Sequence, residues 1–254
     1  MTTLVVPRTK VPETEVGRGL LRGLRAVYQC AFPNGGVVDL LDLVNGNTLT
    51  DNNTVTTAAG PSSKLARATQ FTAATSENLQ ASDVAAHSFA GDMTIVLRVY
   101  LDAKPVGEMH PCTKDNTATN REWAMAWQGS VTDRFAFVNG NANWGVIDIA
   151  VANTFGAPAT ATWYQIKGDV DSVGGTVGIR VNNGARDSVT KTATMVNGTE
   201  GLRIGCRGGG TPALFWDGRI AQVCLWGRLL TTREDAYLYN GGQGRQFRKN
   251  RGFY

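Results

Sequence analysis

Short segments in which apolar and polar residues alternate recur along this chain of 254 residues. In residues 93–101, for example, Ile95, Leu97, Val99 and Leu101 fall on one face of a strand, which predicts that this face packs on a core. Further segments of this kind are residues 123–127, 134–138, 144–149, 163–171 and 175–184. Short strands between frequent turns, with almost no helical periodicity, predict an all-β protein made of two packed sheets.

One helix is predicted, close to the end of the chain. Thr231 is followed three residues later by Glu234, the spacing of a capping box at a helix start. Asn240, Gly241 and Gly242 are the residue types that end helices. Residues 217–242 therefore read as a buried strand, a tight corner and one short capped helix.

The order of these segments resembles the LamG-like jelly-roll domains of the concanavalin A-like lectin and glucanase group. The resemblance rests on residues 217–242, on the tryptophan-led strand at residues 163–171, and on the Asn183-Gly184 turn that ends the strand after it. It implies a two-sheet antiparallel jelly-roll sandwich over residues 19–243 with one short C-terminal helix. Residues 1–18 are predicted to be an extended N-terminal arm, and residues 244–254 a basic C-terminal tail.

The net charge of +4 is concentrated at the two ends of the chain, and the region between them is mildly acidic. Basic ends on an acidic body suggest arms that dock on an acidic surface, although short charged tails also occur as merely solvated ends. The candidate anchoring residues are Arg8, Lys10, Arg245, Arg248, Lys249 and Arg251.

The residues of the common catalytic motifs are absent. No glutamate has the Glu-x-Asp-x-x-Glu spacing of the related glucanases, the two histidines His87 and His110 are far apart, and there is no Gly-x-Ser-x-Gly, HExxH or phosphate-binding loop. We therefore predict that the chain is not an enzyme and has no catalytic residue. No apolar stretch is long enough for a membrane span, and no secretory signal is visible at the start.

The cysteines and the acidic loops both favour structural roles. The cysteines form no CxxC pair and are predicted to be buried thiols, with a disulfide as the alternative; they are Cys30, Cys112, Cys206 and Cys224. The resemblance suggests calcium as a ligand, but turn formation is the favoured role for the acidic and amide side chains in the loops. These groups are Asp39 with Asp42 and Asn45, Asp169 with Asp171, and Asn182 with Asn183. No metal and no cofactor is predicted, with calcium as a weak alternative.

Trp216 stands beside a glycine-rich loop, at a place that the jelly roll would put on its rim. It is a candidate contact for a sugar or for a subunit interface. Trp163 and Trp226 match core positions of the family and are predicted to be buried. Only the C-terminal tail combines basic and aromatic residues, which disfavours nucleic acid as a partner.

Two functions from different classes follow from these features. The first is a structural protein of a virus particle, a phage capsid decoration or cement protein anchored by its arms, with other capsid proteins and copies of itself as partners. Such a protein is made in the host cytoplasm and located in the virion. The alternative is a carbohydrate-binding or adhesion module, lectin-like and calcium-assisted, whose partner is a surface glycan. Fold by itself does not decide between them.

Overall fold

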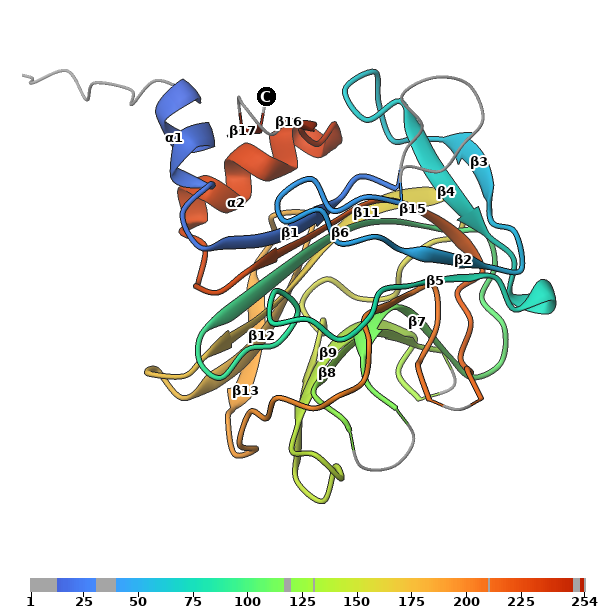
Figure 1. The fold of residues 1–254 in the computed structure, drawn as a ribbon. Coiled ribbons are helices and arrows are strands. Elements are labelled where there is room, and N and C mark those ends of the chain that lie inside the picture. Colours follow the sequence, from blue (N-terminus) through green and yellow to red (C-terminus); the bar gives the residue numbers. More distant parts are fainter. Residues whose placement is uncertain are drawn as a thin grey trace, which may run out of the picture.

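A computed structural model describes residues 13–30, 40–116, 120–129, 131–209, 211–248 and 252–253. Two antiparallel sheets face one another and form a sandwich, with two helices above one of them (Figure 1). The two-sheet antiparallel sandwich predicted from the sequence is confirmed. Among the described residues, no helix is long and apolar enough to cross a membrane.

The first sheet has eight strands and includes the longest ones. In spatial order they are β13 (Arg186–Thr190), β12 (Thr176–Val181), β11 (Thr162–Asp171), β6 (Met93–Leu101), β15 (Gly218–Trp226), β4 (Arg67–Phe71) and β3 (Thr56–Ala59), and β1 (Leu24–Tyr28) pairs with the second half of β15. Its central neighbours come from distant parts of the sequence, because β6 pairs with β11 and β15, and β15 also pairs with β4 and β1.

The second sheet has seven strands, and Trp123, Trp127, Phe135 and Phe137 on its strands are aromatic residues of the core. In spatial order they are β10 (Ile147–Val151), β9 (Arg134–Gly140), β8 (Trp123–Gln128), β7 (Glu108–Lys114), β14 (Arg203–Ile204), β5 (Asn78–Gln80) and β2 (Thr50–Asn52). The remaining elements are α1 (Glu13–Gly19), α2 (Thr232–Tyr239), two single 3-10 turns, η1 (Ala73–Thr75) and η2 (Asn240–Gly242), and the small hairpin of β16 (Phe247–Arg248) and β17 (Gly252–Phe253).

The main core lies between the two sheets, as the alternation along β6 predicts. Ile95, Leu97, Val99 and Leu101 are all fully buried there. The intervening residues of β6 are also mostly buried, because a second apolar cluster covers the outer face of the eight-stranded sheet. This second cluster consists of Leu20, Val27, Val96, Cys224, Trp226, Leu230, Leu238, Phe247 and Phe253.

The described residues at the two ends correct the prediction of an extended N-terminal arm over its last residues and add a buried part to the predicted basic tail. Residues 13–19 form helix α1 and are not extended. In the C-terminal tail, the buried ring of Phe253 packs on Trp226, and that of Phe247 packs on Phe253. Burial of apolar area contributes roughly 25 cal/mol per Å², so burying these aromatic rings stabilises the packed tail relative to a tail in solvent. The described parts of both ends therefore belong to the folded body.

Two local predictions are settled by backbone and burial. All four cysteines are buried and none is in a disulfide, as predicted. The turn after β12 is shifted by one residue from the predicted Asn183-Gly184 pair. Asn182 and Asn183 have φ angles of 52° and 57°, and the Gly184 amide donates to the Val181 carbonyl at 2.9 Å. The Asn-Asn pair thus occupies the two central positions of a type I′ turn.

Gly168 on β11 allows the two sheets to approach. A Cβ atom added there would lie 2.4 Å from Cδ2 of Phe137, a ring on the opposite sheet that is itself fully buried. We therefore expect Gly168→Ala to lower the free energy of unfolding by about 2 kcal/mol, measured by urea denaturation. Gly91→Ala is the control, because its Cβ would meet only the Ser172 hydroxyl, at 3.9 Å. Equal midpoints for the two variants would show that the sheets have room at Gly168.

Candidate functional site

Helix α2 lies over the outer face of the eight-stranded sheet (Figure 1), and its Leu238 belongs to the apolar cluster on that face. Along the paired strands β11 and β6, the outward residues come in successive rows: Asp169 with Thr94, Lys167 with Val96, Gln165 with Arg98, and Trp163 with Tyr100. The first two rows lie beside the start of α2, the third lies beneath its end, and the fourth lies beyond it. The face therefore offers two different candidate sites.

Arg98 fixes the end of α2 to the sheet. Its side chain is 2% exposed, and its guanidinium donates to the carbonyls of Leu238 at 3.0 Å, Tyr239 at 2.8 Å and Gly242 at 3.1 Å. Carbonyls at the end of a helix lack partners within the helix and carry partial negative charge, so a cation is favoured there. Arg98 thus sets the boundary between the covered middle of the face and its free end at Trp163.

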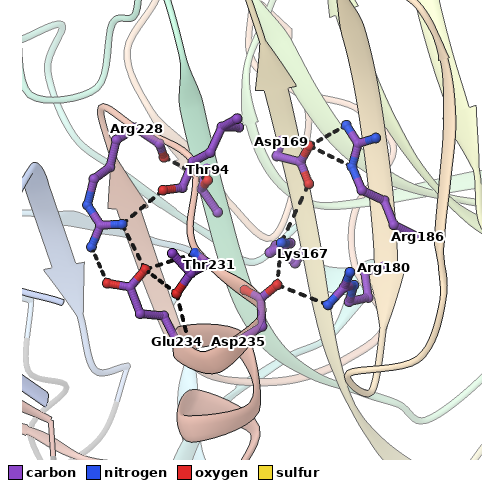
Figure 2. Close-up of polar contacts among 10 residues, drawn as sticks. Thr94, Lys167, Asp169, Arg180, Arg186, Arg228, Thr231, Glu234 and Asp235 are labelled. Carbon is purple, nitrogen blue, oxygen red and sulfur yellow. Dashed lines mark hydrogen bonds and ion pairs between the residues drawn. The ribbon is translucent and has the colours of Figure 1, made fainter. Parts of the chain in front are cut away.

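The first candidate site is a charged pocket beside the start of α2, shown in Figure 2. Its cavity of about 270 Å³ is lined mainly by charged side chains. The Lys167 ammonium lies 2.5 Å from Asp235 Oδ2 on the helix and 3.7 Å from Asp169 Oδ2 on its own strand. Arg180 reaches Asp235 at 3.1 Å, and Arg186 reaches Asp169 at 2.5 Å. Each cation therefore faces a carboxylate.

The charges of this pocket hold the helix in place. Burial raises the pKa of the Asp235 carboxyl, while Lys167 and Arg180 act against that rise. A lone buried carboxylate would be costly, so the pairing is what allows Asp235 to sit against the sheet. We interpret the pocket as the joint between α2 and strands β11 and β12.

The capping box predicted at Thr231 and Glu234 is present and extends the same joint (Figure 2). The Glu234 amide donates to the Thr231 hydroxyl at 3.3 Å, and the Thr231 amide donates to Glu234 Oε2 at 2.8 Å. Arg228 also donates to Glu234. Burial would raise the pKa of Glu234, but the hydrogen bonds from Arg228 and Thr231 outweigh it and hold the pKa below its usual value. Glu234 therefore has a structural role.

The second candidate site lies at the other end of the face, and we call it the aromatic row. It consists of Trp163 on β11, Tyr100 on β6, Arg219 on β15 and Gln70 on β4. The strand register places each residue directly opposite the next one, so the four side chains cross four adjacent strands in one line. All four are partly exposed.

The side chains of the aromatic row hold one another in position. The rings of Trp163 and Tyr100 have their centroids 5.4 Å apart, and the Arg219 guanidinium carbon lies 4.4 Å from the centroid of the Tyr100 ring. Arg219 Nε donates to Gln70 Oε1 at 3.2 Å, and Gln70 Nε2 donates to the neighbouring Asp102 Oδ2 at 2.6 Å. The row thus presents an aromatic surface at one end and fixed donors and acceptors at the other.

This composition suits a polyhydroxylated ligand. A sugar ring has an apolar face of C–H groups that packs on an aromatic ring, and hydroxyls that both donate and accept. Arg219 supplies donors and the neighbouring Asp102 supplies acceptors, and their side chains lie 3.6 Å apart, so the cation of the row is paired with an anion beside it. Of the two sites, only the aromatic row combines a partly exposed ring with polar groups of both kinds.

The structure corrects the prediction for two tryptophans. Trp216 was the candidate sugar or interface contact, but its side chain is 0% exposed and packs in the core between the sheets, so it presents no surface to a partner. Trp163, predicted to be a core residue, is partly exposed. A signal for this was present in the sequence, because Trp163 shares its strand face with the polar residues Gln165, Lys167 and Asp169. Trp226 is buried as predicted.

Of the six predicted anchoring residues, the structure describes Arg245 and Arg248. Arg245 is engaged within the body: its Nε donates to the Tyr237 carbonyl at 2.8 Å, and its guanidinium carbon lies 3.8 Å from the centroid of the Tyr237 ring. Arg248 is an exposed residue of β16. Arg8, Lys10, Lys249 and Arg251 lie outside the described residues.

The acidic and amide side chains of the loops accept hydrogen bonds from backbone amides of the chain. Asp42 accepts hydrogen bonds from the amides of Val27 and Val44 at 2.9 Å and of Asn45 at 3.1 Å, which is the turn role predicted for it. Asn182 accepts from the Gln165 amide at 2.9 Å. Asp39 lies outside the described residues. Within the described ranges, no three His, Cys, Asp or Glu side chains are grouped so that they could hold a metal ion.

The sequence itself matches a known family over residues 73–234, the concanavalin A-like lectin/glucanases superfamily. The matched region is more than half of the chain and includes β6 to β15. The chain belongs to the concanavalin A-like lectin/glucanase superfamily. No curated protein sequence matches this member of the superfamily at a significant level.

Solved structures with the same fold include several binding domains. Domain 4 of AbnA, an extracellular GH43 arabinanase of Geobacillus stearothermophilus solved with arabinotriose, has 17% sequence identity and a TM-score of 0.58, and the match covers 83% of this chain and 95% of that one. The binding domain of Paraclostridial Mosquitocidal Protein 1 has 14% identity and a TM-score of 0.64, with coverages of 88% and 53%. The binding domain of Botulinum Neurotoxin DC, solved with SialylT, has 10% identity and a TM-score of 0.63, with coverages of 86% and 51%.

These likenesses establish the fold alone, because the identities are low. The chain spans about half the length of the two toxin binding domains. A sialidase of Trypanosoma rangeli also shares the fold, with a TM-score of 0.56, so the fold occurs both in binding domains and in chains of glycoside-cleaving enzymes. The absence of catalysis in this superfamily member stays a prediction from its sequence.

Proposed function

We propose that this chain is a glycan-binding domain and that it binds its ligand at the aromatic row. The observation that carries the proposal is the line of Trp163, Tyr100, Arg219 and Gln70, in which a partly exposed indole stands beside prearranged donors and acceptors. Small-ligand sites in proteins combine apolar contact with a few fixed polar groups in this way.

The comparisons support this proposal at the level of the fold. The arabinanase domain was solved with arabinotriose and the neurotoxin binding domain with SialylT, so relatives by fold include proteins that hold carbohydrate ligands. Their identities to this chain are too low to transfer a site. The position on the outer face of the eight-stranded sheet is argued from this chain's own residues.

The virion role predicted from the sequence depended on arms that reach a partner. The described part of the N-terminal arm is helix α1, which contacts α2, and Phe247 and Phe253 of the tail are buried. The role as a capsid decoration protein, its location in a virus particle and its self-association stay predictions. The glycan-binding role has support from the fold and from the aromatic row, and we prefer it.

The proposal is tested by probing an array of surface and plant-type glycans with the full chain and with Trp163→Ala. We expect the parent chain to bind a subset of glycans, and the variant to bind them at least about tenfold more weakly, because stacking on an aromatic ring contributes on the order of 1–2 kcal/mol. Phe155→Ala is the control, since Phe155 is another exposed aromatic residue outside the row, 38% exposed. An array without signal for the parent contradicts glycan binding, and binding that survives Trp163→Ala places the site elsewhere.

A further inference from the structure

We infer that the aromatic row binds an extended, neutral oligosaccharide of about three sugar rings, laid across the strands, and not a single terminal sugar. This inference rests on the proposed function and adds the length, direction and charge class of the ligand. It follows from the span of the row, from what borders it, and from its charges.

The span of the row exceeds one sugar ring. Trp163, Tyr100, Arg219 and Gln70 belong to the adjacent strands β11, β6, β15 and β4, so three strand spacings separate the two ends. With neighbouring strands about 4.8 Å apart, the row is about 14 Å long. A monosaccharide on the indole of Trp163 cannot reach Gln70, whereas a short chain of rings laid along the row contacts both.

The residues that border the row allow an oligosaccharide to extend in one direction only. On the helix side, the next row of Gln165, Arg98 and Gln222 is 2–5% exposed, because the end of α2 and the segment after it cover these residues. On the other side, β6 ends at Leu101 and β11 begins at Thr162. A ligand held by more than one residue of the row must therefore lie across the strands.

The charges favour a neutral chain. Arg219 and the neighbouring Asp102 form a pair at 3.6 Å at the polar end of the row, and Gln70 bonds to both of them. A polyanionic glycan would gain from Arg219 but would face Asp102, while neutral hydroxyls can donate to the carboxylate and accept from the guanidinium. Binding of a neutral chain should also depend little on salt, because screening acts on net charge interactions.

The test is calorimetric titration of the full chain with neutral oligosaccharide series of one to five units, in gluco-, galacto-, manno-, xylo- and arabino-configurations. For the series that binds, we expect affinity to rise at least about tenfold from one unit to three and then to level off, with little change at high salt. Gln70→Ala should weaken the trisaccharide severalfold and leave the monosaccharide unchanged. If Gln70→Ala does not fold, Asp102→Asn takes its place as the test variant, because Asp102 is at an exposed position. It should likewise weaken binding of the trisaccharide.

Each other outcome is distinct. The extended-chain inference is overturned if a monosaccharide binds as tightly as the trisaccharide, or if neither variant changes the affinity for the trisaccharide. Both results leave glycan binding in place. An array signal confined to acidic glycans, with none of the neutral series bound, overturns the neutral class. If Trp163→Ala instead changes the sedimentation of the chain and no glycan binds, the row is a protein interface, and both the inference and the proposed function fail.

Discussion

Asp235→Ala is expected to lower the free energy of unfolding by about 3 kcal/mol at neutral pH, because it removes one partner from a buried ion pair. Lys167, with a side chain 7% exposed, loses the carboxylate that lies 2.5 Å from its ammonium, and it keeps only Asp169 at 3.7 Å, which Arg186 already shares. Arg180 loses its partner at 3.1 Å. The charged groups left behind are too buried to be solvated well.

The measurement is urea unfolding, together with amide hydrogen exchange of helix α2, which should open first. The control is Arg233→Ala, because Arg233 is an exposed residue of the same helix and its loss should change stability by less than about 0.5 kcal/mol. The double variant Lys167→Met with Asp235→Leu should recover much of the loss, since apolar groups can replace a buried ion pair. A double variant as unstable as Asp235→Ala would mean that the helix is lost for another reason.

Acidification is expected to destabilise the protein through His87. This side chain is fully buried, its Nε2 lies 2.9 Å from the Tyr28 hydroxyl, and burial lowers its pKa from 6.5 to about 4. Between pH 6.5 and about pH 4, His87 is protonated in the unfolded chain but neutral in the folded protein. The stability that neutral His87 contributes is therefore present above pH 6.5 and is lost as the pH falls toward 4, by about 3 kcal/mol in total.

The contribution of His87 is isolated by comparing the parent with His87→Gln at several pH values. Glutamine can still bond to the Tyr28 hydroxyl but does not titrate, so the stability difference between the two proteins should shift by about 3 kcal/mol across this window. The comparison is needed because Glu122 acts in the opposite direction: burial raises its pKa from 4.5 to about 7, so its own contribution improves as the pH falls. A difference that is flat with pH would show that His87 takes up its proton as readily in the fold as in the unfolded chain.

Helix α2 connects stability with the proposed function. Asp235 and Glu234 hold its start, and Arg98 holds its end beside the aromatic row. The side of the row nearest the helix is therefore formed only while α2 is docked. Variants that loosen the charged pocket should affect glycan binding only to the extent that the whole helix leaves the sheet.

The sequence by itself determined the fold class, the alternating strands, the capping box and the burial of the cysteines. Each of these depends on contacts between near neighbours in the chain or on the simple preference of apolar groups for a core. The family pattern in residues 73–234 adds the order of the strands. The exact turn after β12 was missed by one residue, because two adjacent asparagines and a glycine all tolerate the left-handed conformation.

Only the tertiary structure decided which tryptophan is exposed, where the tail lies, and which residues form a site. The polar residues on the strand face of Trp163 were a signal in the sequence, but alternation does not show which part of a face a helix will cover. It also gives no position for Trp216, which lies outside the strands. The C-terminal tail packs on the body because Phe247 and Phe253 are buried in the same apolar cluster as Leu238 of α2. Tyr100, Trp163, Arg219 and Gln70 become neighbours solely through the register of strands that are far apart in the sequence, and that register is fixed by the packing of the whole sandwich.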